Sequence, residues 1–427
     1  MDELKIAIAG LGTVGGGTVT LLHRNARLLE TRAGRPLRLV AAAALEKPAD
    51  LPLEGAAFFG DARAMAREAD YDVLVELIGG ASGVALDVVT EALSRGRHVV
   101  TANKAMVAHH GLALAGKAEA AGVTFAFEPA VAGGIPVIKS LREGLAANTL
   151  SQVYGILNGT CNYILTTMRE TGREFADVLA EAQSLGYAEA DPSFDIDGID
   201  TAHKLAILTS LAFGTAVDFS KVHVEGIRRV SAFDIRSAEE LGYRIKLLGI
   251  ARRTETGIEQ RVHPCMVPIN SSIGCVDGVF NAVVAEGDFV GRTVFEGRGA
   301  GAMPTASAVV ADILDIATGR RTPSFGVPAS ALAPLVPASL DDHRGAFYIR
   351  LMVLDRPGVF AGIAAALRDE EVSMESVLQR GRAPGETVPV VMTVHDTQER
   401  SMMKALDRIR AIQEVVEPPH MIRIEAF

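Results

Sequence analysis

The chain has 427 residues, of which 48% are hydrophobic and 22% are charged, and its formal net charge is −10 at pH 7. This length predicts two or three domains of an ordinary folded protein, and the negative charge argues against a nucleic-acid or anionic-membrane partner. Three scattered cysteines argue against a disulfide framework or a zinc site, and we find neither a signal peptide nor an apolar stretch long enough to span a membrane, so we expect a cytoplasmic protein.

The first 130 residues alternate short apolar runs with segments of helical periodicity. The apolar runs predict strands at 5–9, 37–45, 73–78 and 98–101. Helical patterns lie between them, for example at 61–69 and 84–94. Strands that alternate with helices of this length predict a parallel sheet built by right-handed crossovers.

A glycine-rich motif follows the first strand directly. Residues 10–15, Gly-Leu-Gly-Thr-Val-Gly, match G-x-G-x-x-G and open a helix. The first glycine permits a tight turn, the second lets backbone amides approach a pyrophosphate, and the third lets helix and strand pack closely. Such a turn can be purely structural, but its place in a βα unit predicts a dinucleotide site at the helix N-terminus. The cofactor-binding residues of this motif would be Gly10, Gly12, Thr13, Val14 and Gly15.

An acidic residue at the end of the second strand normally binds the ribose hydroxyls of the cofactor. Glu46 is the candidate, because it follows the apolar run that ends at Leu45. Its charge would repel a 2′-phosphate, which favours NAD over NADP. The adjacent Lys47 could reverse this preference, and a solvated glutamate at a helix start is the structural alternative.

After about residue 130 the elements lengthen into helices and the strands of a mixed sheet. We expect strands at 150–157, 222–230, 243–252 and 258–267 and helices at 161–170, 175–184 and 200–213. A further helix at 303–319 has proline near its start and glycine after its end.

The C-terminal part begins with a linker at 320–345, which carries four prolines and no sustained periodicity. Residues 346–427 then predict a compact ferredoxin-like unit of the order β-α-β-β-α-β. Its expected strands are 346–353, 372–380, 388–394 and 421–425, and its expected helices are 359–370 and 399–410.

Polar stretches occur where the predicted architecture has strand ends and cleft walls. In an open parallel sheet, ligands bind outside the carboxyl ends of the strands, and the fourth strand ends in Thr-Ala-Asn-Lys with Lys104. The segment 128–136 is too glycine-rich for regular structure and predicts an irregular turn with exposed carbonyls. A third stretch, 186–204, carries several acids before Lys204.

Asp200 and Lys204 are i, i+4 neighbours on one face of the predicted helix. A surface ion pair of this kind contributes under about 1 kcal/mol. The leucines and isoleucine around the two residues predict a largely buried helix, and buried charges need partners or a function. We therefore favour a functional site, in which His203 packs rather than acts as a base.

The motifs together resemble those of the homoserine dehydrogenase family. The stretches that carry the resemblance, in family order, are GLGTVGGG, TANK, EPAVAGGIP, LNGTCNYIL, LGYAEADP, DGIDTAHKLAIL and GAGAMPTASA. The likeness extends from about residue 4 to residue 320. The unit 346–427, with Asp-Arg-Pro-Gly at 355–358 in its first strand–helix turn, resembles an ACT domain, which is an amino-acid-sensing module.

The resemblance implies that the protein interconverts L-homoserine and L-aspartate 4-semialdehyde with NAD or NADP, toward threonine and methionine. Hydride transfer to an aldehyde leaves a developing alkoxide, which a lysine ammonium can stabilise. The catalytic residues would be Lys104, Lys204 and Asp200. The substrate-binding residues would be Gly159, Thr160, Tyr187, Glu189 and Asp195, with Glu189 on the substrate ammonium. Asn103, Lys104 and Gly301 would join the cofactor site.

The family also implies a monovalent cation, usually sodium, held by backbone carbonyls. By position these carbonyls belong to Glu128, Val131, Gly133 and Ile135. The resemblance further implies a homodimer or homotetramer and a regulatory amino acid, with L-threonine as the expected ligand of the ACT unit.

With the family in view, four parts are expected. Residues 1–130 form a Rossmann-type dinucleotide-binding domain, completed by the helix 303–319. Residues 131–302 form an α+β domain for substrate binding and dimerisation, 320–345 is the linker, and 346–427 is the regulatory ACT domain.

The sequence also departs from the family pattern. Leu45 stands where many NADP-using members have arginine, which adds weight to NAD. Pro129 and Arg298 replace residues that are more often alanine and proline, and Arg298 lies near the expected phosphate site, where it can alter cofactor affinity.

Two other functions compete with this interpretation. A phosphorylating semialdehyde dehydrogenase needs a nucleophilic cysteine beside a base, and Cys161 is the one cysteine near the site motifs. A sensor without catalysis would bind dinucleotide and amino acid only, but both lysines and all the carboxylates are retained.

Overall fold

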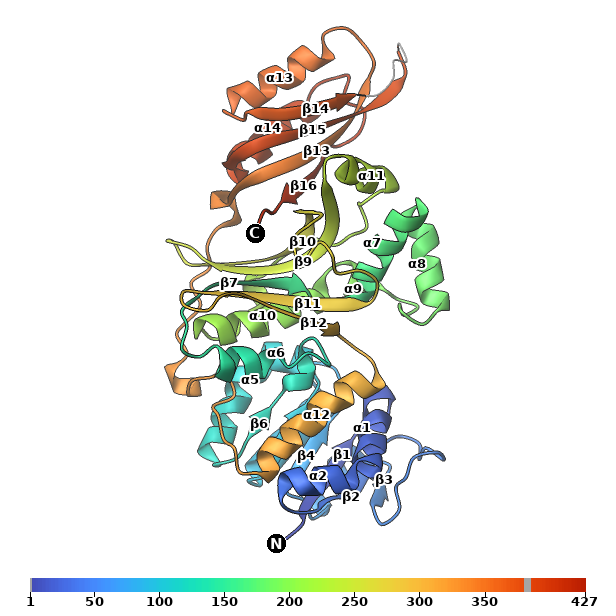
Figure 1. The fold of residues 1–427 in the computed structure, drawn as a ribbon, viewed down its shortest axis with the longest axis vertical. Coiled ribbons are helices and arrows are strands. Elements are labelled where there is room, and N and C mark those ends of the chain that lie inside the picture. Colours follow the sequence, from blue (N-terminus) through green and yellow to red (C-terminus); the bar gives the residue numbers. More distant parts are fainter. Residues whose placement is uncertain (1, 380–384) are drawn as a thin grey trace.

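The computed structural model describes residues 2–379 and 385–427. Three parts follow one another along the longest axis of the molecule, as Figure 1 shows. The N-terminal sheet and its helices lie at one end, a mixed sheet with its helices lies in the middle, and the C-terminal unit lies at the other end. Within the described residues, no helix is both long enough and apolar enough to cross a membrane.

The N-terminal part is a six-stranded parallel sheet in the order β3-β2-β1-β4-β5-β6. Its strands are β1 (Leu4–Ala9), β2 (Leu37–Ala43), β3 (Ala57–Phe59), β4 (Val73–Glu76), β5 (His98–Thr101) and β6 (Phe125–Ala126). Its helices are α1 (Thr13–Arg24), α2 (Ala26–Ala33), α3 (Ala62–Glu68), α4 (Val84–Ser94), α5 (Lys104–Ala120) and, from far along the chain, α12 (Ala302–Ala317). The predicted parallel sheet is confirmed.

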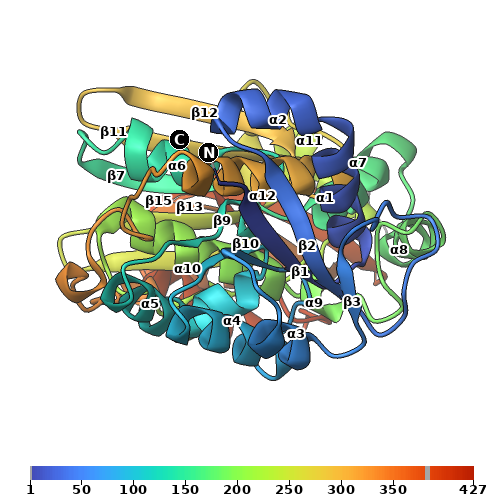
Figure 2. The same ribbon diagram turned by 90° about the horizontal axis from the view of Figure 1, so that it is seen from below.

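Helices cover both faces of this sheet, which explains why its strands are apolar throughout rather than alternating. Ala7 and Ala9 of β1 face α3, α4 and α5, whereas Ile6 and Ile8 face α1, α2 and α12. The two helix layers are visible on opposite sides of β1 and β2 in Figure 2. Gly17 of α1 lets the start of α12 pack closely against α1, because a Cβ at this position would lie 2.6 Å from the carbonyl oxygen of Ala302.

The middle part is built on a long mixed sheet. Its strands are β7 (Leu150–Ile156), β8 (His223–Val224), β9 (Tyr243–Arg253), β10 (Ile258–Pro268), β11 (Phe280–Gly287) and β12 (Gly291–Arg298). Its helices are α6 (Val137–Lys139), α7 (Gly159–Thr171), α8 (Phe175–Ser184), α9 (Ser193–Ile196), α10 (Ile199–Phe213) and α11 (Ala232–Glu240). Short helical turns lie at Glu128–Ala130, Ser140–Gly144 and Phe219–Lys221.

The prediction of a strand at 222–230 was wrong after residue 224. Only His223 and Val224 form a strand, as β8. The chain then turns because Gly226 lies directly against the backbone of α9, where a Cβ would come within 2.2 Å of the Ile196 carbonyl oxygen. The β11–β12 hairpin and α11 were not predicted from the sequence, although α11 begins with a capping box formed by Ser231 and Asp234.

The C-terminal unit has the predicted β-α-β-β-α-β order. Its elements are β13 (Arg344–Leu354), α13 (Val359–Asp369), β14 (Met374–Gln379), β15 (Thr387–Gln398), α14 (Glu399–Arg410) and β16 (His420–Ile424). Its strands lie in the order β16-β13-β15-β14. The end of the strand expected at 372–380, Arg380, lies outside the described residues.

The C-terminal unit forms part of the middle sheet and is not connected to it by a linker alone. β16 pairs in parallel with β10, so ten strands form one continuous sheet. A buried charge cluster crosses the junction, in which Arg261 of β10 contacts Glu259 at 2.9 Å and Glu425 at 2.5 Å. The predicted linker 320–345 contains two short helical turns, at Ala329–Ala331 and Leu340–Asp342, and its last two residues already belong to β13. It packs along the body, where Ser324 donates to the carbonyl oxygen of Phe125 at 2.7 Å.

Candidate functional site

The glycine motif after β1 forms a tight turn that admits only glycine. Gly10 has φ of +101°, and a Cβ on it would lie 2.6 Å from the carbonyl oxygen of Leu77. A Cβ on Gly15 would lie 2.0 Å from the carbonyl oxygen of Gly10. The N-cap of α1 is Gly12, which offers no side chain to the first-turn amides. These amides therefore stay available to a pyrophosphate, with the positive end of the helix dipole behind them.

The ends of the neighbouring strands carry polar residues that shape the cleft. Glu46 is exposed in the loop after β2, and the preceding Leu45 is also exposed. Glu76, at the end of β4, is fully buried and accepts hydrogen bonds from the backbone amides of Ile78 and Gly79 at 2.7 and 3.0 Å. Glu76 was not predicted from the sequence, where its signal is an acid at the end of an otherwise apolar strand.

Lys104 is positioned by the residue before it. Asn103 is the N-cap of α5, where its Oδ1 accepts from the amide of Met106 at 3.0 Å. Its Nδ2 donates to the carbonyl oxygen of Gly80 at 2.7 Å, which ties the start of α5 to the loop after β4. Lys104 is therefore held at the first turn of α5, facing the middle domain.

A cavity of about 420 Å³ lies where α5, α7, α10 and the end of the β11–β12 hairpin meet. Its lining includes many of the residues expected in the site: Lys104, Gly159, Thr160, Tyr187, Asp195, Asp200, Lys204 and Gly301. Glu189 does not line this cavity but lies exposed two residues after Tyr187, and its charge contributes to raising the pKa of Lys104.

Asp200 is the centre of the site. Its Oδ1 contacts the Nζ of Lys104 at 2.9 Å, and its Oδ2 accepts from the Nζ of Lys204 at 2.7 Å. Lys204 also donates to the carbonyl oxygen of Leu157 at 2.7 Å. Asp200 and Lys204 are buried, so the surface ion pair considered from the sequence alone does not describe them.

Asn158 completes this cluster. Its Nδ2 lies 2.8 Å from both Asp195 Oδ1 and Asp200 Oδ2, and its Oδ1 accepts from the amide of Cys161 at the start of α7. One asparagine therefore holds both carboxylates and caps the helix. The sequence contains this signal as an N-cap asparagine, but nothing local indicates that two distant aspartates converge on it.

The electrostatics keep Asp200 ionised and Lys104 protonated. Burial by itself would raise the pKa of Asp200, but Lys204 and Lys104 together hold that pKa below its usual value. Burial would lower the pKa of Lys104, and the attraction of Asp200 reverses this shift and raises it. Burial and the neighbouring charge of Asp200 raise the pKa of Asp195. The cluster can stabilise a developing negative charge and release a proton.

Two groups beside the site are packing residues. His203 stacks on Phe219 with ring centroids 4.2 Å apart, and burial lowers its pKa to about 4. The thiol of Cys161 is fully buried and donates to the carbonyl oxygen of Asp195 at 3.3 Å, and burial raises its pKa well above the usual value. A thiol held protonated in this way is a poor nucleophile, which argues against a phosphorylating semialdehyde dehydrogenase.

The segment 128–136, expected to be irregular, begins with the short helical turn Glu128–Ala130 and is irregular only after it. Ala132 and Gly133 have φ of +54° and +41°, and a Cβ on Gly133 would lie 2.5 Å from the carbonyl oxygen of Gly299. The Glu128 carboxylate accepts from the amides of Ile138 and Lys139 at 3.0 and 2.8 Å, and burial together with Asp312 raises its pKa to about 7. The turn therefore packs against the loop 299–301, which lines the cavity.

The carbonyl oxygens of this turn differ in their partners. That of Ile135 accepts from the amide of Val137 at 2.8 Å, whereas those of Val131 and Gly133 accept no hydrogen bond from the described residues. Within 2–379 and 385–427, no group of three or more His, Cys, Asp or Glu side chains could hold a metal ion. Buried carbonyl oxygens without donors suit a hard monovalent cation.

The chain is similar to known homoserine dehydrogenases along its whole length. The family model described as Homoserine dehydrogenase matches residues 136–314, and the model described as Homoserine dehydrogenase, NAD binding domain, matches residues 10–128. The homoserine dehydrogenase of Neisseria gonorrhoeae is 46% identical, with all of both chains covered. That of Pseudomonas aeruginosa is also 46% identical, with 100% of this chain and 99% of the relative covered.

Solved structures show the same likeness. The crystal structure of a homoserine dehydrogenase from Thiobacillus denitrificans superposes with a TM-score of 0.93 at 45% identity, covering 100% of this chain and 99% of that one. A hyperthermophilic archaeal homoserine dehydrogenase in complex with NADPH superposes with a TM-score of 0.63 at 27% identity, covering 76% of this chain and all of that one.

Proposed function

The chain belongs to the homoserine dehydrogenase family, and from that premise we propose how its residues carry out the reaction. It is an NAD(P)-dependent oxidoreductase that interconverts L-homoserine and L-aspartate 4-semialdehyde, a step toward threonine and methionine. The observation that carries the proposed mechanism is the buried Asp200, which contacts two lysine ammonium groups in the cavity.

In this mechanism, Lys204 and Lys104 bind the oxygen on C4 of the substrate. A nicotinamide cofactor held at the glycine turn after β1 would supply the hydride chemistry at C4. Lys204 uses two of its three N–H groups on Asp200 and Leu157, so its third N–H is oriented for the developing alkoxide. Either ammonium can donate the proton that completes the alcohol, and Asp200 keeps both in place.

The amino-acid end of the substrate would lie toward the loop 186–195. Glu189 would bind its ammonium, and Asp195 would help to orient it. Gly159, Thr160 and Tyr187 would form the rest of this wall, and the Thr160 hydroxyl, which donates to the carbonyl oxygen of Tyr187 at 2.7 Å, joins helix and loop. The exposed carboxylate of Glu189 is free to approach a cation.

For the cofactor, we propose that the pyrophosphate lies on the amides of the glycine turn. The residues proposed for this site are Gly10, Gly12, Thr13, Val14, Gly15, Glu46, Asn103, Lys104 and Gly301. Glu46 would accept hydrogen bonds from the adenosine ribose, which favours NAD over NADP.

A steady-state assay with L-homoserine and each cofactor tests both the activity and the proposed preference. We expect kcat/KM with NAD to equal or exceed that with NADP. Glu46→Ala should move the ratio toward NADP by roughly tenfold, which corresponds to about 1.4 kcal/mol. Glu54→Ala, a change at another exposed glutamate between β2 and β3, is the matched control and should leave the ratio unchanged. A strong native preference for NADP would contradict the role of Glu46 and point to Lys47 or Arg298.

We also propose a sodium ion at the turn 128–135, held by the backbone carbonyls of Glu128, Val131, Gly133 and Ile135. The support is the pair of buried carbonyl oxygens without donors at Val131 and Gly133. The ion would fix the turn that packs on the loop 299–301.

If this proposal holds, sodium chloride should raise the melting temperature relative to choline chloride at equal ionic strength. A sodium concentration of roughly a hundred times its Kd would add about 2.7 kcal/mol to the free energy of unfolding. Gly133→Ala, which places a Cβ 2.5 Å from the Gly299 carbonyl oxygen, should abolish the sodium effect. Equal melting temperatures of the native protein in the two salts would contradict the proposed sodium site.

The unit 346–427 is proposed to be an ACT domain that binds a regulatory amino acid, with L-threonine as the ligand. The turn 355–358 leads into α13, whose N-cap is Gly358 with φ of +95°, so the first amides of the helix can meet a carboxylate. A unit that serves only in oligomerisation is the alternative.

Titration of the intact enzyme with L-threonine tests this proposal by calorimetry and by inhibition. Typical couplings of roughly 1–3 kcal/mol would change substrate affinity about five- to 150-fold. Gly358→Val should weaken the inhibition and leave basal activity intact, because a β-branched residue disfavours this φ while the space around Gly358 is open. If calorimetry detects no binding of threonine or any other amino acid, the unit serves another role.

Other parts of the expected organisation stay predictions. We propose that 1–130 with the helix 303–319 binds the cofactor and that 131–302 binds substrate and pairs subunits into a homodimer or homotetramer. The cytoplasmic location also stays a prediction.

A further inference from the structure

One wall of the catalytic cavity is made by two segments that lie far apart in the sequence. Gly159 and Thr160 line it at the start of α7, and Val279 lines it just before β11. The two segments are in close contact, because a Cβ on Gly159 would lie 2.8 Å from the carbonyl oxygen of Val279. The shape of this wall therefore depends on how α7 is fixed against residues 276–280.

Helix α7 is joined to this second segment along one of its faces. Asn162 donates from Nδ2 to the carbonyl oxygens of Val276 and Phe280, both at 3.2 Å. Thr166, one turn further along the helix, accepts from the amide of Gly278 at 3.1 Å. Residues at i and i+4 lie on the same face of a helix, so the segment runs along this face of α7.

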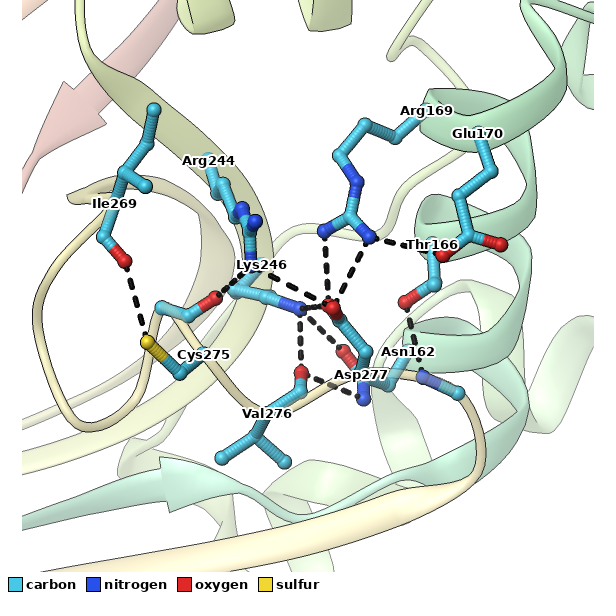
Figure 3. Close-up of polar contacts among 12 residues, drawn as sticks. Asn162, Thr166, Arg169, Glu170, Arg244, Lys246, Ile269, Cys275, Val276 and Asp277 are labelled. Carbon is cyan, nitrogen blue, oxygen red and sulfur yellow. Dashed lines mark hydrogen bonds and ion pairs between the residues drawn. The ribbon is translucent and has the colours of Figure 1, made fainter.

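The buried side chain of Lys246, in β9, contacts both sides of this junction. It is 1% exposed, and its Nζ donates to the carbonyl oxygen of Val276 at 2.5 Å, to Asp277 Oδ1 at 3.0 Å and to Asn162 Oδ1 at 3.2 Å. Figure 3 shows its ammonium directed at these three residues. All three N–H groups of the ammonium are therefore used, and one side chain connects the helix, the segment and the sheet.

Asp277 is held by two further cations. Arg169 of α7 donates to its two carboxylate oxygens at 2.8 and 3.0 Å, and Arg244 of β9 lies 3.5 Å from its Oδ2. Burial by itself would raise the pKa of Asp277, but Arg169 and Lys246 lower it to about 2, so the carboxylate stays ionised. Because both arginines remain when Lys246 is replaced, such a variant leaves Asp277 paired.

The charge of Lys246 depends on pH. Burial lowers its pKa to about 8 against the attraction of Asp277. The other charged or titratable groups around it, from α7, α11, β9 and β10, are Arg169, Glu170, Glu239, Arg244 and Cys265. The two arginines repel its charge, and burial raises the pKa of the Cys265 thiol well above the usual value. Lys246 is therefore protonated below about pH 8, and its attraction to Asp277 is lost as the pH rises through that value.

We propose that Lys246 is a positioning residue for the reaction, which holds α7 against residues 276–280 and so sets one wall of the substrate cavity. This inference rests on the proposed function, in which Gly159 and Thr160 contact the amino-acid end of the substrate. The N–H groups of Lys246 are all taken within the cluster, so it acts through this wall and not on the substrate itself. When its charge is lost, the contact between the helix and the segment weakens. A displacement of about 1 Å in a site can cost roughly 100-fold in rate, so a small shift of the wall has a measurable effect.

The first test is Lys246→Met in the full-length enzyme, which keeps the length of the side chain but removes its charge and its donors. We expect KM for L-homoserine to rise by about tenfold, because the wall moves away from the substrate. The value of kcat should stay close to the native one, since Lys104, Asp200 and Lys204 belong to α5 and α10. The Kd of NADH, measured by its fluorescence, should also be unchanged. Lys221→Met, at an exposed lysine of the middle part, is the matched control and should leave all three constants native.

The second test measures KM for L-homoserine as a function of pH. In the native enzyme this KM should rise as the pH increases through about 8, where Lys246 loses its charge. Lys246→Met should lack this rise. Asp277→Asn removes the charge that favours the protonated lysine, so its rise should occur at lower pH. Loss of the proton from the substrate ammonium affects all three enzymes at the same pH and so cannot produce these differences.

The assignment would be overturned if folded Lys246→Met kept the native KM, or if its KM and that of the native enzyme depended on pH in the same way. A lower melting temperature with a native KM would make Lys246 a structural residue only, and a loss confined to NADH binding would place its effect in the cofactor site. If Lys246→Met does not fold, the native enzyme and Asp277→Asn decide, and a native KM that stays constant through about pH 8 would rule the proposal out. A failure of the proposed function itself is distinguishable, because it would appear as normal turnover in a Lys204 variant.

Discussion

Replacing Lys204 with alanine is expected to lower kcat by about 100- to 1,000-fold or more, the scale of losing an electrostatic transition-state group. The reason is geometric: Asp200 and the Leu157 carbonyl fix two of the three N–H groups of Lys204, which leaves the third for the alkoxide. Lys104 still neutralises Asp200 in the variant, so folding should survive. Turnover is measured at saturating homoserine and NAD, and in the reverse direction with the semialdehyde.

The controls for this experiment separate chemistry from folding. NADH binding should be retained, because the glycine turn after β1 makes no contact with Lys204. Lys104→Ala should lower kcat to a similar extent, whereas Lys117→Ala, at an exposed position of the same helix as Lys104, should keep native turnover. Near-native kcat in Lys204→Ala would show that the transition state does not need this ammonium.

The second large effect is expected at the junction between the middle domain and the C-terminal unit. Arg261 is fully buried and contacts Glu259 of its own strand and Glu425 beyond β16. Arg261→Met fills a similar volume but leaves two carboxylates buried without their shared cation. Removing one partner of a buried ion pair costs about 3–5 kcal/mol. Urea unfolding, followed by circular dichroism, should show this loss of stability.

An exposed ion pair in the same unit is the matched control. Arg344 and Asp396 lie 3.8 Å apart with side chains that are 65% and 66% exposed. Asp396→Ala should therefore cost less than about 1 kcal/mol, because solvent screens such pairs. If Arg261→Met were as mild as this control, the charge cluster would not hold the junction together. Deleting the C-terminal unit would also remove Glu425, the partner of the buried Arg261 in the middle sheet. A deletion would therefore disturb the stability of the middle domain, and point variants are the better test of regulation.

Local features of the sequence determined the cofactor end of this protein. The glycine turn needs the positive φ of Gly10 and leaves no room for a Cβ at Gly15, so the motif can be recognised without knowing the fold. The apolar runs with intervening helical periods determined the parallel sheet in the same way, because both faces of each strand are covered. The β-α-β-β-α-β order of the last eighty or so residues was equally readable, and the family motifs identified the reaction.

Only the tertiary structure decided how the catalytic charges are organised. Lys104, Asn158 and Asp200 come from α5, the start of α7 and α10, and no periodicity says that one carboxylate will meet two lysines and an asparagine.

The tertiary structure also decided that the C-terminal unit is continuous with the middle sheet. A proline-rich segment predicts a linker, but β16 pairs with β10, where Glu425 meets the buried Arg261 and Arg423 pairs with the half-exposed Glu225. Backbone turns and strand faces are set by neighbours in the chain, so sequence patterns express them. Buried charges are set by partners that folding brings together, and their energies depend on burial and distance, which exist only once the chain has folded.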